Sequence, residues 1–112
     1  MTDPVRIKQL SVTHAHLRSA KRYVSLRLPP GIPDSHVALA EVEKNIPEEA
    51  LLTCMDLLAT RGVQERPRSG FWRDMERAAE TLGQMERATT YRAQFLFTLG
   101  SPPDEMSEVP GG

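Results

Sequence analysis

The stretch that decides the fold prediction is Ile46–Trp72, with the sequence IPEEALLTCMDLLATRGVQERPRSGFW. Pro47 suits the first position of a helix, where a backbone amide is not needed. Glu48 and Glu49 complement the positive end of the helix dipole. Apolar residues follow at helical spacing: Leu51, Met55 and Leu58. We therefore predict a helix from Pro47 to Gly62, because glycine readily adopts the left-handed conformation of a helix stop.

Two short segments, Val63–Arg66 and Phe71–Arg73, follow this helix and flank the turn-forming sequence Pro-Arg-Ser-Gly at 67–70. This order favours a short β-hairpin. The alternative is that Ser69 directly caps another helix, whose apolar face would be Phe71/Trp72, Met75, Ala79 and Leu82. Gly83 weakens or ends that helix. A last apolar face consists of Met85, Ala88, Tyr91, Phe95 and Leu99.

The ends of the chain give weaker patterns. Thr13 is a candidate cap for a helix over about 13–24, while the alternation of residues 22–28 predicts a short strand. The sequence PPGIPDS at 29–35 is a break, and a further helix is expected over 36–45. We predict one domain over residues 1–100 and a disordered, acidic, Pro- and Gly-rich tail over 101–112.

The composition places the chain among soluble globular proteins. Of its 112 residues, 39% are hydrophobic and 26% are charged. Its apolar runs are shorter than the roughly 20 residues that cross a bilayer, and the first residues do not resemble a signal peptide. A single cysteine cannot form an internal disulfide, which is typical of a reducing compartment. We expect a cytoplasmic protein without a membrane partner.

The net charge of −1 hides an uneven charge distribution. Residues 1–33 carry six basic side chains against one acid, and residues 34–60 carry six acids against one base. Residues 61–73 are basic again. Such segments suit an anionic partner, or they complement each other within one fold.

The span from Leu39 to Arg73 resembles the helix-turn-helix and wing of bacterial winged-helix regulators. LAEVEKN at 39–45 would be the first helix, and Ile46–Glu49 the turn and the start of the DNA-reading helix. The segment 61–66 would lead into the wing, with Pro67–Gly70 at its tip. The resemblance implies an α+β, mostly helical fold with a winged-helix-like centre, a basic N-terminal segment and C-terminal helices. It also implies a regulator of transcription, and a homodimer formed through the C-terminal helices.

The expected reading helix departs from this pattern, because its exposed positions include Glu48, Glu49 and Asp56. Carboxylates repel phosphates, whereas DNA-reading helices present basic or amide side chains. The first interpretation is DNA contact through the basic N-terminal segment and wing, with the residues Lys21, Arg22, Arg66, Arg68 and Arg73. The alternative is an adaptor or inhibitor that binds a protein partner through Glu48, Glu49, Asp56, Phe71 and Trp72.

Enzyme chemistry is not indicated. His14, His16, His36 and Cys54 do not match a known metal-ligand spacing, and catalytic motifs are not found. Cys54 lies on an apolar helix face, as a core residue would. Trp72 is best interpreted as a core anchor, and the rival interpretation places Phe71 or Trp72 at an interface. We predict a non-catalytic regulatory protein without cofactor or metal that binds DNA or a regulatory protein.

Overall fold

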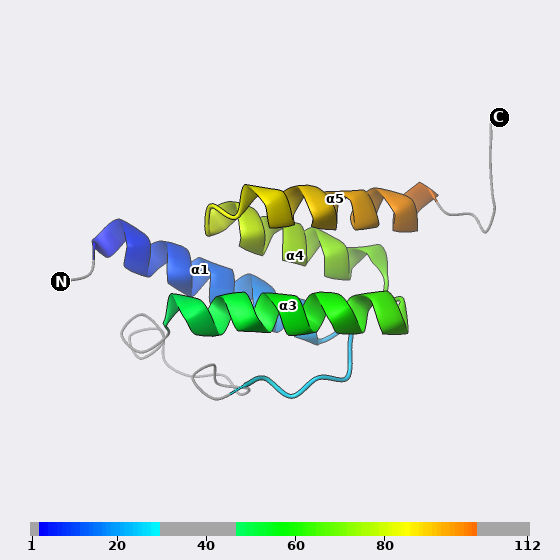
Figure 1. The fold of residues 1–112 in the computed structure, drawn as a ribbon, viewed down its shortest axis with the longest axis horizontal. Helices are drawn as coiled ribbons and strands as arrows, with labels where there is room; N and C mark the ends of the chain where they lie inside the picture. Colours follow the sequence, from blue (N-terminus) through cyan, green and yellow to red (C-terminus); the bar gives the residue numbers. More distant parts are fainter. Residues whose placement is uncertain (1–2, 30–46, 101–112) are drawn as a thin grey trace.

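The described part of the chain, residues 3–29 and 47–100 of the computed structural model, is helical and contains no strand. Its helices are α1 (Pro4–Lys21), α3 (Glu48–Glu65), α4 (Ser69–Thr81) and α5 (Met85–Gly100) (Figure 1). The predicted α+β class with a winged-helix-like centre is therefore wrong. The predicted break beyond residue 29, the helix over 36–45 and the tail over 101–112 lie outside the described residues.

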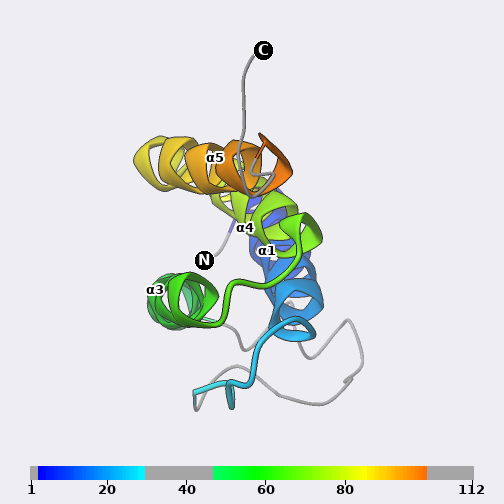
Figure 2. The same cartoon turned by 90° about the vertical axis from the view of Figure 1, so that its right-hand side faces the viewer.

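Helices α1, α3 and α5 run in one direction, and α4 runs in the opposite one (Figure 1). Contacts between distant residues fix these directions: Arg6 with Glu48, Ser25 with Glu65, Ser19 with Asp74, and Asp56 with Arg87. Three helix C-termini and the start of α4 consequently lie at one end of the molecule. That end faces the viewer in Figure 2.

Helix α4 is the centre of the bundle and packs against α1, α3 and α5. Its buried residues form one broad face of the helix: Phe71, Trp72, Asp74, Met75, Ala78 and Ala79. The Phe71 and Trp72 rings meet edge to face with centroids 4.8 Å apart, and Trp72 lies 6.0 Å from the Tyr91 ring of α5. This aromatic row joins α4 to α5, as expected from the large apolar area that such rings bury.

Gly62 connects the same aromatic row to α3. A Cβ atom built on Gly62 would lie 2.4 Å from Phe71 Cε2 and 2.9 Å from Trp72 Cζ2. The missing side chain is therefore what lets the two rings approach the α3 backbone. The predicted helix stop at Gly62 is wrong, because the helix continues to Glu65 and the glycine serves packing instead.

The predicted wing is wrong for a related reason. Val63–Glu65 belong to α3, residues 66–68 form a short loop, and Phe71–Arg73 lie inside α4. The alternative, in which the next helix begins at Ser69, gives the correct start. The N-cap is nevertheless Arg68, and its side chain makes no capping hydrogen bond.

Helix α1 starts earlier than the sequence predicted. The Asp3 carboxylate accepts a hydrogen bond from the Val5 amide at 3.0 Å, and Pro4 occupies the first turn. Thr13, the predicted cap, is instead buried in the middle of the helix. The predicted strand over 22–28 is wrong, although its alternation did reflect burial of Val24 and Leu28. A strand also needs a neighbouring strand for its backbone hydrogen bonds, and the described residues supply none.

The turn between α4 and α5 agrees with the sequence pattern. Gly83 has a positive φ of 80°, and the Gln84 amide donates to the Ala79 carbonyl at 2.8 Å. This is the hydrogen bond of a glycine-terminated helix. The prediction that Gly83 ends the helix is confirmed.

Replacing Gly62 by alanine should destabilise the protein. Alanine is favoured over glycine in a helix by about 1 kcal/mol, but the added methyl group would overlap Phe71. We expect a net loss on the order of 1–3 kcal/mol in the free energy of unfolding, measured by urea denaturation. The control is Gly100→Ala, where a Cβ meets nothing within 4 Å. Equal stability of the two variants would contradict the packing role of Gly62.

Candidate binding surface

The end of α1, the end of α3 and the start of α4 meet at one end of the bundle. A Cβ atom on Gly70 would lie 2.6 Å from the Tyr23 hydroxyl oxygen, so Tyr23 covers the first turn of α4. Arg61 Nε donates to the Ser25 carbonyl at 3.2 Å, and the Ser25 amide donates to the Glu65 carboxylate at 3.1 Å. These contacts join segments that are about 40 residues apart in the chain.

This convergence gathers basic side chains from separate segments. We define the basic end as Lys21, Arg22, Arg61, Arg66 and Arg68. It contains four of the five residues that the sequence predicted for DNA contact. The fifth, Arg73, is exposed one turn further along α4. The structure therefore brings the basic N-terminal segment and the former wing together, although no wing exists.

The arginines of this end differ in their partners. Arg61 pairs with Glu65 at 3.1 Å, and Lys21 also has an interaction partner. Arg22, Arg66, Arg68 and Arg73 are exposed. None of these four arginines forms an ion pair with a carboxylate of the described residues.

Arg66 has an unfavourable backbone conformation. It is the residue that ends α3, with φ 52° and ψ 58°, and its amide donates to the Gly62 carbonyl at 3.0 Å. Among the described residues other than glycine, it alone has a positive φ. The left-handed region costs an ordinary residue roughly 1–2 kcal/mol, so glycine is the usual residue at such a helix end.

Arg68 is likewise a poor choice for its position. It is the N-cap of α4, where Ser, Thr, Asp or Asn would accept a hydrogen bond from the first turn. A cation also opposes the positive end of the helix dipole. By contrast, Lys21 lies in the last turn of α1, where a cation is stabilising. Dipole compensation explains Lys21 but leaves Arg68 unexplained.

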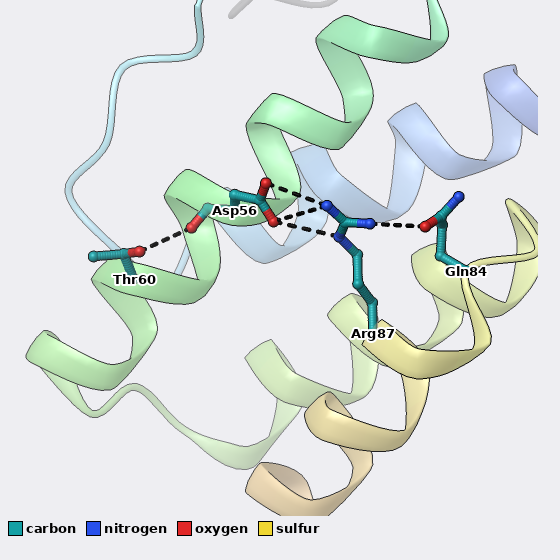
Figure 3. A network of polar contacts seen from close by, with 4 residues as sticks. All are labelled: Asp56, Thr60, Gln84 and Arg87. Carbon is teal, nitrogen blue, oxygen red and sulfur yellow. Dashed lines mark hydrogen bonds and ion pairs between the residues drawn. The ribbon is translucent and has the colours of Figure 1, made fainter.

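The acidic residues of the alternative site are mostly neutralised within the fold. Glu48 pairs with Arg6. Asp56 accepts from Arg87 Nε and Nη2 at 3.2–3.3 Å, which ties α3 to α5, while Gln84 accepts from Arg87 Nη1 at 2.7 Å (Figure 3). Glu49 alone of the three is exposed without an ion pair to a described residue. Internal ion pairs therefore occupy two of the three carboxylates that were predicted to form an acidic docking face on α3.

The aromatic residues of the alternative site are buried. Phe71 is fully buried, and Trp72 is 3% exposed. They belong to the core and do not form an exposed aromatic surface. Trp72 does, however, contribute to the wall of a surface hollow, and this is a role that the sequence did not indicate.

The hollow lies between α3 and α5, beside the basic end. It has a volume of about 450 Å³ and is lined by Gly62, Val63, Arg66, Pro67, Trp72, Gln94, Phe97 and Thr98. Val63 and Phe97, from facing helices, are 59% and 71% exposed. Among the described residues, no acidic side chain contributes to this lining. The hollow therefore combines apolar side chains, uncharged polar side chains and the cation of Arg66.

A second hollow of about 540 Å³ lies nearer the start of α5, around the Asp56–Arg87 ion pair, and Tyr91 contributes to it. Burial raises the pKa of Tyr91 to about 12, so the phenol keeps its proton at neutral pH. On the other side of α5, Leu96 and Leu99 are exposed. The homodimer expected through the C-terminal helices stays a prediction.

The residues with chemical reactivity do not form a reaction centre in the described part of the chain. Cys54 is fully buried, and burial raises the pKa of its thiol to about 12. Burial also lowers the pKa of His16, an effect that Asp74 opposes and Arg77 supports. The described residues contain no group of three or more His, Cys, Asp or Glu side chains placed to hold a metal ion.

Comparisons with known proteins add nothing to this description. No protein-family model, curated protein or solved structure matches the chain. None of the helices in the described ranges is long and apolar enough to cross a membrane.

Arg66→Gly should stabilise the protein, because glycine adopts the left-handed conformation without strain. We expect a gain of about 1 kcal/mol in the free energy of unfolding. The matched control is Arg73→Gly, the same change inside α4, which should lose about 1 kcal/mol. Chemical denaturation measures the free energy of unfolding, which should rise in Arg66→Gly and fall in Arg73→Gly. A loss of stability in Arg66→Gly would contradict the backbone strain assigned to Arg66.

The Cys54 thiol should be unreactive in the folded protein. Because the thiolate is the reactive form, a thiol reagent at pH 8 should label Cys54 only after unfolding. Burial raises the pKa of this thiol from its ordinary 9.0 to about 12, so the folded protein keeps it protonated well above pH 9. The stability that this difference provides is complete below pH 9 and is lost as the pH rises toward 12. Rapid labelling under native conditions would show that α3 opens locally.

Proposed function

We propose that this protein is a non-catalytic binding protein whose basic end docks on an acidic surface of a partner protein. One observation carries the proposal: Arg66 and Arg68 are exposed, and both occupy backbone positions that favour other residues. Glycine at 66 and a capping residue at 68 would each stabilise the isolated fold.

Two such departures within three residues indicate selection for something other than stability. Strained backbone and poor local choices concentrate at functional sites, where stability is exchanged for activity. At positions 66 and 68 the feature that is kept, at the expense of stability, is a positive charge. Arginine is suited to this task, since its planar guanidinium can donate two parallel hydrogen bonds to one carboxylate.

A protein partner is favoured over the DNA partner by the surroundings of these arginines. The wing that would have followed the DNA backbone is replaced by helix and a short loop. Arg66 also lines a hollow together with Val63 and Phe97, and these exposed side chains offer contacts that an apolar side chain can make but a phosphate group cannot. Interfaces between proteins combine such apolar depressions with arginine. Duplex DNA is the competing partner, and a binding experiment separates the two.

The test compares a fluorescent glutamate-rich peptide with a fluorescent random DNA duplex at increasing salt concentration. We expect the peptide to bind at low ionic strength and to dissociate as salt screens the charges. Arg66→Gly combined with Arg68→Ser should weaken peptide binding at least tenfold, while the free energy of unfolding rises.

The matched control for charge is Lys8→Glu, an exposed change near the start of α1, at the opposite end from Arg22. It should leave peptide affinity unchanged, whereas Arg22→Glu should reduce it. The proposal fails if the peptide does not bind even at low salt, or if the DNA duplex binds more tightly than the peptide.

A further inference from the structure

The hollow beside Arg66 has features of a docking site for one particular kind of side chain. Its walls come from α3 and α5, through Val63 and Phe97, and Trp72 of α4 contributes to its lining. Val63 and Phe97 remain exposed although they face the same depression. Covering them would remove apolar area from water, which favours binding by roughly 25 cal/mol per Å².

We propose that this hollow receives a bulky apolar side chain from an acidic segment of the partner protein. The proposal rests on the proposed function, and it adds what the partner must carry beside its carboxylates. Charge complementarity identifies the occupant, because Arg66 lines the hollow and none of the described residues in the lining is acidic. Arg68 is two residues away, where it can contact a second carboxylate.

The dimensions of the site agree with this occupant. A volume of about 450 Å³ lies in the usual range of roughly 300–1,000 Å³ for ligand pockets. It accommodates an aromatic or leucine side chain together with part of the backbone that carries it. Gln94 and Thr98 supply polar atoms on the α5 side, so backbone groups of a bound segment would find hydrogen-bond partners.

The fixed position of Arg66 strengthens the recognition. Its backbone is held by the hydrogen bond to Gly62, the same glycine that lines the hollow. The backbone from which the Arg66 side chain extends is therefore anchored next to the hollow. A partner segment matches this arrangement when a carboxylate and a bulky apolar side chain lie close together on one of its faces.

Two synthetic peptides of equal length and charge test the proposal on the full-length protein. The first is rich in glutamate and contains only alanine besides, and the second replaces the central alanine by phenylalanine. We expect the second peptide to bind at least tenfold more tightly, since 1.4 kcal/mol of apolar burial corresponds to a factor of ten. Trp72, the single tryptophan of the chain, reports entry into the hollow by a change in its fluorescence.

Phe97→Ala and Val63→Ala should each reduce the advantage of the phenylalanine peptide while leaving the alanine peptide unchanged. Both positions are exposed, so the fold should persist, and circular dichroism verifies this. The matched control is Leu99→Ala on α5, which is 59% exposed but does not line the hollow. It should bind both peptides as the unmodified protein does.

The outcomes separate this inference from the proposed function. Equal affinity for both peptides, lost in Arg66→Gly, would overturn the role of the hollow and leave the basic end as the binding site. Absence of binding to either peptide at low salt would overturn both proposals. Preference for the phenylalanine peptide that persists in Phe97→Ala and Val63→Ala would place the apolar contact elsewhere and contradict the inference.

Discussion

The close approach of the Phe71 and Trp72 rings to the backbone at Gly62 is the contact on which the arrangement of α3, α4 and α5 depends. A glycine in a helix lowers helix stability by about 1 kcal/mol relative to alanine. In return, two large rings pack directly on α3, and Trp72 extends the row to Tyr91 of α5. The same contact makes Gly62 and Trp72 part of the lining of the hollow. Core packing and the candidate docking surface thus share residues.

The direction of the helices explains most of the uneven charge distribution. Three parallel helices place their C-termini at one end, where cations such as Lys21 are stabilising, and Glu48 and Glu49 lie in the first turn of α3. Internal ion pairs with Arg6 and Arg87 neutralise Glu48 and Asp56 of the acidic segment. This explanation does not cover the cation at the N-cap position of Arg68, nor the left-handed backbone of Arg66, which favours glycine. The proposed function therefore rests on these two arginines and not on the total charge of the basic segments.

Stability and binding are opposed at this loop. Each of the two arginines occupies a position at which a different residue would favour the folded state, at a cost of about 1 kcal/mol each. A small domain has only 5–15 kcal/mol of total stability, so this is a substantial fraction. The central position of α4 and the packing of its buried face against the other helices supply stability that the loop does not.

The sequence by itself determined the start of α3, the apolar faces of α4 and α5, and the turn at Gly83, because each follows from local periodicity or backbone preference. It could not reveal why Gly62 is glycine, since the reason is a contact with Phe71, nine positions later. For the same reason Gly62 was taken as a stop, and Val63–Arg66 as a strand. Only the tertiary structure decided that Arg22 and Arg66 lie at one end, and that Val63 and Phe97 face one hollow. Those placements depend on how distant helices pack, which sequence spacing does not encode.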